Sequence, residues 1–457
     1  MSKPLTQGLA EWVVQPSFSQ VPADLKPLLR TAFIDTVACL FSGEREAVTQ
    51  TALTLVQNRG SRPEVPLLTG QAMLSVSDAA FVSAVSAHAL DFDDMALNGH
   101  PSVVLVPALL AAGMQLGAND EKLLASYLVG YEVWAELVSR EPDSLHNKGW
   151  HPTSVIGTVA CAAALSHIYQ LTKEQAAHAL GIAASQAAGL MGNFGSMTKP
   201  LHAGWAAAHG MEAVQLAKLG ATASKDVLES KTGFLAALSP SGRANRSEFA
   251  ARDALRIRTN GLSIKKYPVC YAAHRVIDGV IDLKNAHNFS ALDIKAIYPT
   301  LSTVTASVLH AHRPATALES KFSIEFACAM AAFEGKVGLP EVTDTQVQRS
   351  DIQQLMEKVQ SRTVEPGCPI EPGFALYDAV RIELNDGSVL DSGSIRFALG
   401  HAQRPLESAA IRSKWNGCLA HRQHSEEALF QKLESLGRTH TGDPFSTWLY
   451  QHYEQGE

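Results

Sequence analysis

The chain of 457 residues is poor in charge and carries no strong excess of either sign. Charged residues make up 18% of the sequence, the formal net charge is −7, and no basic run is longer than Lys265-Lys266. Proteins that bind nucleic acid usually present a clustered basic surface, which neutralises phosphates. The composition therefore excludes nucleic acid as an expected partner.

Several signature motifs are also missing. No G-x-G-x-x-G follows a strand-like segment and no P-loop occurs, so a nucleotide cofactor has no support. The absence of a G-x-S-x-G nucleophile elbow weakens a hydrolase interpretation. The six cysteines are widely spread without a C-x-x-C pair, which is typical of reduced thiols in a cytoplasmic protein.

Long uninterrupted apolar runs are absent as well. The N-terminal segment lacks the apolar core of a signal peptide. The most apolar stretch, Val103–Ala118, contains Pro107 and is too short to span a bilayer. We therefore expect a cytoplasmic protein without a membrane partner.

Apolar residues, in contrast, are abundant at 46%, and many follow a helical period. Between residues 73 and 219, alanine and glycine are frequent on the apolar faces, loops are short and no strand pattern appears. This texture predicts an all-α region. The expected helices span residues 25–43, 47–58, 73–90, 102–117, 120–140, 153–169, 173–190 and 200–219.

After Pro268 the pattern changes to segments rich in β-branched residues, with an Asn385-Asp386-Gly387 hairpin turn. Strands are expected at 293–309, 379–384 and 388–397, and helices at 276–284, 323–335 and 350–358. The tail from about 405 to 455 is helical again. The sequence thus predicts a mainly α fold: a large, discontinuous helical domain (1–265 with 400–457) and a smaller α/β lid domain of antiparallel strands and helices (266–399).

The stretch HALDFDDMALNGHPS contains a cluster of aspartates and histidines in a chain that is otherwise poor in charge. It follows a helix that is apolar on most faces, and such helices are usually buried. Buried charges are costly unless they are paired or used. The cluster is either a functional site or a helix terminator, and its residue types also suit Zn²⁺, Mn²⁺ or Fe²⁺, although the spacing matches no metal motif. The cluster comprises His88, Asp91, Asp93, Asp94 and His100.

Three apolar helices begin at an X-Pro step with a basic residue beside it: His100, His151 and Lys199. Proline suits the first helical position, where its missing N–H would be unpaired anyway. Helix N-termini attract anions. Three such starts predict one pocket for a substrate rich in carboxylates.

The same residue types favour acid–base chemistry. Burial near a helix N-terminus disfavours protonated histidine and thus prepares a general base. Lys199 is the best base or electrostatic clamp, against the alternative of a solvated surface lysine, and His151 is a proton carrier or a hydrogen-bonded core histidine. Lys265 and Lys266 either close over a carboxylate or belong to a solvated linker. Cys270 and His274, four residues apart, form a thiolate–imidazole pair or pack in the core.

Taken together, the chain resembles the MmgE/PrpD family, which includes 2-methylcitrate dehydratase, cis-aconitate decarboxylase and iminodisuccinate epimerase. The matching segments include HALDFDD with HPS, GWHPTSVIGTVACAAA, TKPLHAGWAAAHG, IKKYPVCYAAH and ESKFSIEFACA, from about residue 30 to 420. The resemblance implies a large helical domain built from both chain ends, a smaller α/β lid domain, a homodimer, and neither cofactor nor metal.

The resemblance also implies roles for individual residues. The family's active-site positions fall on Asp91, His100, His151, Lys199 and Lys265. A further set lies inside the matching motifs and is expected to contact the substrate: His202, Lys266, Tyr267, Cys270 and His274. The shared chemistry is proton transfer at a carbon next to a carboxylate of a di- or tricarboxylic acid, with cationic groups stabilising the enediolate.

Two departures from the family pattern bear on the reaction. Met95 stands where dehydratases and decarboxylases have threonine, in a shorter loop, and Cys270 replaces a histidine of the decarboxylase. With fewer polar side chains than those relatives, the site suits a dicarboxylate. An epimerase needs bases on both faces of the reacting carbon, and His151 or Tyr267 opposite Lys199 would supply them. The first expectation is an isomerase similar to iminodisuccinate epimerase. The alternatives are a 2-methylcitrate-type dehydratase, a cis-aconitate decarboxylase, or a non-catalytic polycarboxylate-binding protein.

Overall fold

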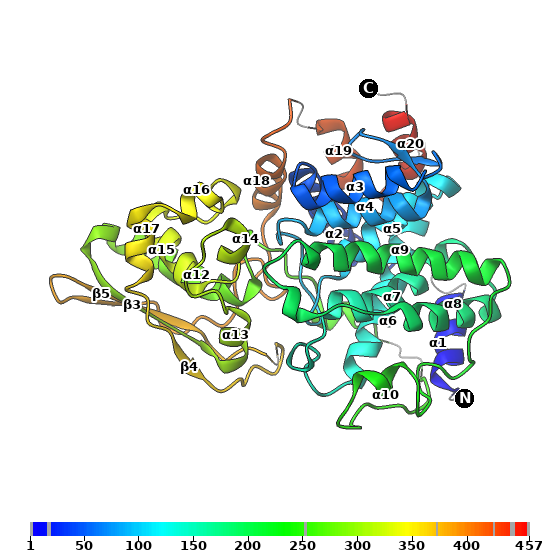
Figure 1. Cartoon of the computed structure of the whole chain (residues 1–457), viewed down its shortest axis with the longest axis horizontal. Helices are drawn as coiled ribbons and strands as arrows, with labels where there is room; N and C mark the ends of the chain where they lie inside the picture. The colour runs from blue at the N-terminus through cyan, green and yellow to red at the C-terminus, as the bar shows by residue number, and fades with distance from the viewer. Residues whose placement is uncertain are drawn as a thin grey trace. The chain divides into compact units, whose positions relative to one another are not determined.

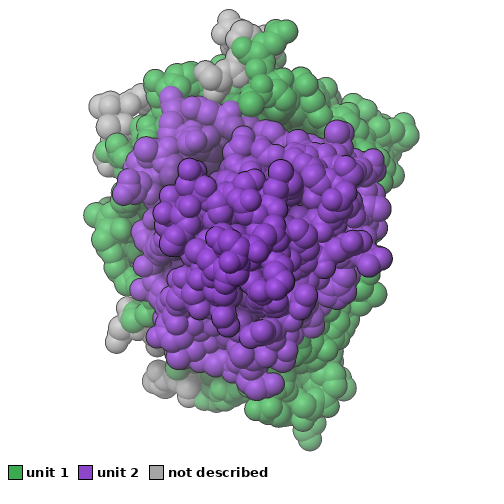
Figure 2. Space-filling model, turned by 90° about the vertical axis from the view of Figure 1, so that its left-hand side faces the viewer, with its two compact units in different colours: residues 1–89, 93–262, 418–457 green, residues 90–92, 263–417 purple. Residues whose placement is uncertain are grey.

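The computed structural model describes residues 3–15, 20–250, 254–371, 373–423, 426–438 and 444–454. These residues form two compact units, coloured separately in Figure 2. Unit 1 comprises residues 1–89, 93–262 and 418–457, and unit 2 comprises residues 90–92 and 263–417. The tripeptide 90–92 groups with unit 2, although its neighbours on both sides belong to unit 1.

Unit 1 is helical and draws on both ends of the chain, as the blue-to-green and red ribbons of Figure 1 show. Its longer helices are α1 (Leu5–Val13), α2 (Lys26–Gly43), α3 (Ala47–Asn58), α4 (Val76–His88), α5 (Pro101–Leu116), α6 (Asp120–Arg140), α7 (Pro152–Ile168), α8 (Lys173–Gln186), α9 (Thr198–Lys218), α19 (Glu427–Ser435) and α20 (Phe445–Glu454). Its short helices are η2 (His146–Lys148), η3 (Met191–Asn193), α10 (Phe234–Leu238) and α11 (Ile257–Asn260).

Four helices, α4, α5, α7 and α9, form the centre of unit 1 and pack on one another. All 17 residues of α7 are buried, and most of α5 is buried as well. Helices that are apolar on every face are stable only inside a core. Small residues let these helices approach closely, because a larger side chain would hold the backbones apart.

Gly204 on α9 shows how close this approach is, and it supports a stability prediction. A Cβ atom at Gly204 would lie 2.4 Å from Val85 Cγ2 and 2.9 Å from the Phe81 carbonyl oxygen on α4. Gly204→Ala is therefore expected to lower the free energy of unfolding by about 1–3 kcal/mol, because the core cannot absorb the methyl group. Urea denaturation measures this change. Gly417→Ala is the control, since nothing lies within 4 Å of its Cβ position on an exposed helix, and it is expected to be neutral or stabilising.

Unit 1 contains a small departure from the all-α expectation. Strands β1 (Val65–Pro66) and β2 (Met73–Leu74) pair antiparallel in two-residue segments. The helix expected from residue 73 therefore starts later, at Val76. The reason is a cap: the Ser75 side chain accepts a hydrogen bond from the Asp78 N–H, which fixes the first turn of α4.

Unit 2 combines helices with a four-stranded sheet of order β4-β3-β5-β6. The strands are β3 (Ile294–Ser302), β4 (Arg362–Val364), β5 (Ala379–Leu384) and β6 (Val389–Asp391). The helices are η4 (Tyr271–Ala273), α12 (His274–His287), η5 (Ala291–Asp293), α13 (Thr303–Val308), α14 (Ala317–Ser320), α15 (Ile324–Glu334), η6 (Leu339–Glu341), α16 (Asp344–Val347), α17 (Ser350–Met356) and α18 (Ser408–Cys418). Helices α12, α15 and α17 pack together, and their apolar faces form one core with β3 and β5.

Three expectations for unit 2 need correction. The strand expected at 293–309 ends at Ser302, whose side chain caps α13 by accepting from the Thr305 N–H. The strand expected at 388–397 shortens to β6. The sheet is also not purely antiparallel, because β4, which the sequence pattern did not reveal, pairs parallel with β3. With three residues and no buried side chain, β4 has no periodicity to detect.

The domain limits also differ from those expected. The boundary near 265 lies close to the start of unit 2 at residue 263, whereas unit 2 extends to residue 417 instead of 399. Helix α18 belongs to unit 2 except for its last residue, Cys418, and its Lys414 contacts Phe92 of the same unit. The tail helices α19 and α20 pack on α2 and α5 in unit 1. Within the described ranges, no helix has the length and apolar character that crossing a bilayer requires.

Candidate active site

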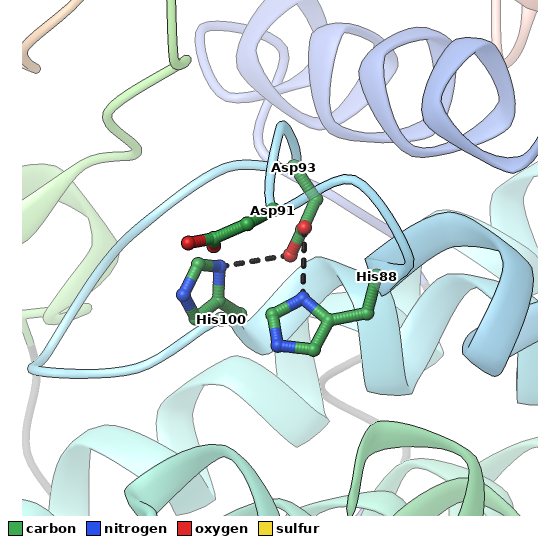
Figure 3. Close-up of side chains that lie close together, drawn as sticks. All are labelled: His88, Asp91, Asp93 and His100. Carbon is green, nitrogen blue, oxygen red and sulfur yellow. Dashed lines mark hydrogen bonds and ion pairs between the residues drawn. The ribbon is translucent and has the colours of Figure 1, made fainter. Parts of the chain in front are cut away.

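The loop between α4 and α5 brings two histidines to one carboxylate (Figure 3). His88, the last residue of α4, places Nδ1 2.9 Å from Asp93 Oδ1, and His100 places Nδ1 2.8 Å from Asp93 Oδ2. Asp93 is fully buried, and both histidines are nearly so. The aspartate is therefore a bridge between two imidazoles and not a cap of α4, whose C-cap is Ala89.

This bridge controls the ionisation of Asp93 and the orientation of both imidazoles. Burial acts to raise the pKa of Asp93, but the electrostatic interactions and hydrogen bonds with His88 and His100 outweigh it and hold that pKa well below its usual range. An ionised carboxylate facing Nδ1 favours a proton on that nitrogen. Nε2 is then the nitrogen at which each ring can exchange a proton with a substrate.

Asp94 anchors the same loop on its other side. The Ser102 hydroxyl donates to Asp94 Oδ2 and lies 2.6 Å from the Tyr127 hydroxyl on α6. Burial, followed by the Asp94 charge, raises the pKa of Tyr127 well above its ordinary value, so the phenol stays protonated. This chain of hydroxyl groups satisfies a buried carboxylate and fixes the start of α5.

The rest of the loop is closed by a tight turn. Ala96 and Gly99 exchange backbone hydrogen bonds of 3.0 and 2.9 Å, and both intervening residues, Leu97 and Asn98, have positive φ angles. This is the geometry of a two-residue type I′ turn. Met95 precedes it, and no hydroxyl side chain occurs between Asp94 and His100.

The basic residues lie at helix starts, as the X-Pro pattern predicted. His100 is the N-cap of α5 and His151 the N-cap of α7, each followed by proline in the first turn. Helix α9 differs: it begins at Thr198, so Lys199 lies inside its first turn and Pro200 is the third helical residue. Proline is tolerated there because the first four N–H groups of a helix have no intrahelical partner.

His151 and His202 form a second imidazole pair beside the first. Their Nδ1 atoms are 3.0 Å apart, so one ring donates and the other accepts. The His151 ring stacks 5.9 Å from His88 and lies 6.5 Å from His100, measured between centroids. Burial, then Lys199, holds the pKa of His151 well below its ordinary value, and burial lowers that of His202 to about 4. Both rings are neutral near pH 7.

Lys199 is the buried cation of this cluster. Its side chain is 6% exposed, which rules out the solvated-lysine alternative. The ammonium lies 5.2 Å from the centroid of Phe194, whose ring is 4.8 Å from that of His151. A cation held beside neutral imidazoles suits the carboxylate of an anionic substrate.

In unit 2, Asp91 and Lys265, two of the expected active-site residues, form an ion pair that the sequence did not predict. Lys265 Nζ lies 2.6 Å from Asp91 Oδ1 and donates to the Asp91 carbonyl oxygen at 2.8 Å. Both side chains are at least 95% buried. Lys265 therefore belongs to an ion pair and not to a solvated linker.

Two of the residues expected to contact the substrate, Lys266 and Tyr267, make other contacts in unit 2. Lys266 is exposed, with Nζ 5.2 Å from the Tyr267 ring. The Tyr267 hydroxyl donates to Asp278 at 2.6 Å, and burial and this carboxylate raise its pKa far above neutrality. Tyr267 is therefore unsuited to the base role considered for it.

The thiolate–imidazole pair considered for Cys270 and His274 does not share a helical face. Cys270 precedes η4 and His274 begins α12. His274 Nε2 lies 3.3 Å from the Val269 carbonyl oxygen, to which it donates. Burial and the charge of Lys265 lower the pKa of His274 to about 3, so the ring is neutral.

One group of the described residues has the composition of a metal site: His88, Asp91, Asp93 and His100, with ligand-type atoms within 4.8 Å of one another. A metal ion there would have to replace the contacts by which Asp93 holds the two histidines. The arrangement as it stands is that of oriented bases.

Sequence patterns missed part of this arrangement. The role of Asp93 as a bridge, the Asp94–Ser102–Tyr127 chain and the contact of Phe194 with Lys199 were not predicted. Asp93, Asp94 and Ser102 carried a signal, since they lie in the stretch that was singled out. Tyr127 carried none, because it lies on a helix distant in sequence. Phe194 carried none, because it is an apolar loop residue outside the motifs that were singled out.

Comparison with known proteins identifies the family to which the chain belongs. Residues 7–247 match the MmgE/PrpD N-terminal domain and residues 267–436 match the MmgE/PrpD C-terminal domain. A protein of Homo sapiens named cis-aconitate decarboxylase is 30% identical over 353 residues, which cover 74% of this chain and 71% of that protein. The Aspergillus terreus protein of the same name is 25% identical over 463 residues, covering 94% and 92%. The chain is therefore an enzyme of isomerase or lyase type and belongs to the MmgE/PrpD family.

Proposed function

We propose that this enzyme transfers a proton at a carbon next to a carboxylate of a small di- or tricarboxylic acid, using its own side chains without a cofactor. The observation that carries the proposal is the cluster of His100, His151 and His202 with Lys199 at three helix N-termini. Neutral imidazoles accept protons, while helix N-termini and a buried ammonium favour anions. Together they suit a carboxylate substrate and its enediolate.

In the proposed reaction, His100 Nε2 removes the proton from the carbon, and the electron pair of the broken C–H bond moves into the carboxylate to form an enediolate. Asp93 keeps the ring oriented and stabilises the imidazolium that forms. Lys199 neutralises the enediolate charge. His151 then delivers its Nε2 proton to carbon while the enediolate collapses to product, and it takes the Nδ1 proton of His202 through their hydrogen bond. Exchange with water afterwards removes the extra proton from His100 and restores the proton that His202 gave up.

Within this chemistry, we propose epimerisation first. An epimerase returns a proton to the same carbon, and two separate proton carriers, His100 with Asp93 and His151 with His202, support such a sequence. The loop that contains Met95 has no hydroxyl group to hold a leaving water or a third carboxylate. A dicarboxylate similar to iminodisuccinate fits a site with these polar side chains.

Decarboxylation of cis-aconitate is the second candidate, because two relatives with that name match most of this chain. Loss of CO₂ would leave a carbanion that needs one proton, and either imidazole pair is suited to deliver it. The absence of a hydroxyl at Met95 and of an imidazole at Cys270 distinguishes this chain from the pattern expected of a decarboxylase.

Proton NMR in D₂O tests the proposal. The purified protein is incubated with iminodisuccinate stereoisomers, 2-methylcitrate, citrate and cis-aconitate. Deuterium at the α-carbon of iminodisuccinate, with interconversion of isomers, is the expected result. Formation of itaconate from cis-aconitate would show that the enzyme is a decarboxylase and not an epimerase. Vinyl signals from 2-methylcitrate would show that it is a dehydratase. A protein that binds these acids without exchanging any proton would refute acid–base catalysis.

We further propose that the enzyme is a homodimer, as the family resemblance implies. Helix α9 and the residue after it support this proposal, since Trp205, Leu216 and Leu219 recur at helical spacing and are 37%, 42% and 87% exposed. Light scattering after size exclusion is expected to give twice the chain mass. A monomer at micromolar concentration would contradict the proposal.

A further inference from the structure

Three consecutive carbonyl oxygens in the loop, those of Leu90, Asp91 and Phe92, each accept a hydrogen bond from a buried lysine of unit 2. Lys321 donates to Leu90, Lys265 donates to Asp91 at 2.8 Å, and Lys414 donates to Phe92 at 2.6 Å. The three lysines are distant in sequence and are 1–9% exposed.

This arrangement costs free energy in two ways. Burying an ammonium removes it from water, and the cost is large unless the charge finds strong acceptors. Asp91 in addition has a φ angle of +53°, in the left-handed region that residues with a Cβ atom rarely adopt. Such strain persists only where surrounding contacts impose it, and it concentrates at functional sites.

The lysine contacts on both sides of Asp91 account for the conformation. Lys321 holds the peptide between Leu90 and Asp91, Lys265 holds the next peptide through the Asp91 carbonyl, and Lys414 holds the peptide between Phe92 and Asp93. The Lys414 ammonium also lies 3.9 Å from the centroid of the Phe92 ring. With these consecutive peptides fixed, the backbone at Asp91 has one orientation left. In that orientation the Asp91 carboxylate meets Lys265 at 2.6 Å.

We propose that Lys321 and Lys414 are positioning residues, which hold Asp91 in the conformation that pairs its carboxylate with Lys265. They act through the backbone of 90–92. For its catalytic consequence, the inference rests on the proposed acid–base function.

Two other lysines of unit 2 provide matched controls. Lys284 donates to the Ala332 carbonyl at 2.6 Å and lies 5.6 Å from the Phe289 ring, and Lys358 donates to the Ile294 carbonyl at 2.6 Å. Both make the same type of bond as Lys414 but to α15 and β3, away from the loop. Substitution of a lysine that merely supports the fold should resemble these controls.

The test begins with hydrogen exchange, which needs no substrate. Lys321→Met, Lys414→Met, Lys284→Met and Lys358→Met are compared by mass spectrometry. Faster exchange of peptides covering 89–95 is expected in the first two variants and not in the controls. Unchanged exchange there, or the same increase in the controls, would overturn the proposal.

Kinetics then separates positioning from general destabilisation. In Lys321→Met and Lys414→Met, kcat is expected to fall about 10- to 100-fold with KM within about threefold, because displacing a catalytic group by about 1 Å costs rates of this order. In an Asp91→Asn background, Lys414→Met should cause no further loss, since both changes disable the same group. If the losses in kcat from Asp91→Asn and Lys414→Met multiplied in the double variant, the inference would be overturned. If the wild-type enzyme turned over none of the four acids, the proposed function would be refuted. The hydrogen-exchange result would still show whether Lys321 and Lys414 hold the backbone at Asp91.

Discussion

Replacing Asp93 with asparagine is expected to lower kcat by about 10³- to 10⁴-fold while the protein remains folded. The carboxylate favours a proton on Nδ1 of both His88 and His100, so Nε2 is the nitrogen at which His100 can take a proton from the substrate. An amide can present its NH₂ group to Nδ1, and the ring then carries its proton on Nε2, where the base must be free. The change preserves shape and removes the tautomer control.

The measurement is kcat in the deuterium-exchange assay, with circular dichroism and urea denaturation to verify folding. Asp78→Asn is the matched control, because Asp78 lies on the same helix α4 and accepts from the Ser75 hydroxyl at 2.8 Å, away from the histidines. Its kcat should stay within about twofold. An Asp93→Asn enzyme that retains more than a tenth of the wild-type kcat would show that His100 is not the base.

Lys199→Met is expected to lower kcat/KM by about 10³-fold and to shift the acid limb of the pH profile upward. The loss follows from removing the cation that neutralises the substrate and its enediolate. For the pH dependence, burial and Lys199 hold the pKa of His151 below its ordinary value, and burial, His88 and Lys199 lower that of His202 to about 4. In the direction of epimerisation in which His151 removes the proton, wild-type activity should therefore persist as the pH falls below 6.5. Without the Lys199 charge both pKa values rise, so His151 becomes protonated, and activity in that direction declines, at a higher pH.

A pH series of kcat/KM for both enzymes measures the shift. Lys218→Met is the control, because Lys218 ends the same helix α9 with Nζ 4.6 Å from the Tyr169 ring. That variant should leave the profile unchanged. A limb that moves to lower pH in Lys199→Met would mean that Lys199 does not act on the imidazoles. Loss of binding alone, with kcat unchanged, would make Lys199 a substrate clamp without a role in the transition state.

The sequence determined the helices and their starts. The apolar segments of α5 and α7 predict buried helices, and Pro101 and Pro152 mark first helical positions, because proline lacks the N–H that later turns need. The placement of His100 and His151 at N-caps follows from that local chemistry. The strand β5 was likewise predicted at its true limits, since β-branched residues and a hairpin turn are local signals too.

The tertiary structure decided which of these residues meet. Whether Asp93 ends a helix or bridges two histidines depends on the path of the chain after His88, and this path is fixed by contacts with residues hundreds of positions away. Lys414 and Lys321 look like ordinary lysines in the sequence, yet they hold the backbone of 90–92. Local sequence specifies helix starts, caps and turns, because these depend on neighbours along the chain, whereas the φ angle of Asp91 depends on distant lysines. The pairing of Asp91 with Lys265, and the pKa values of buried histidines, arise between groups that only packing brings together.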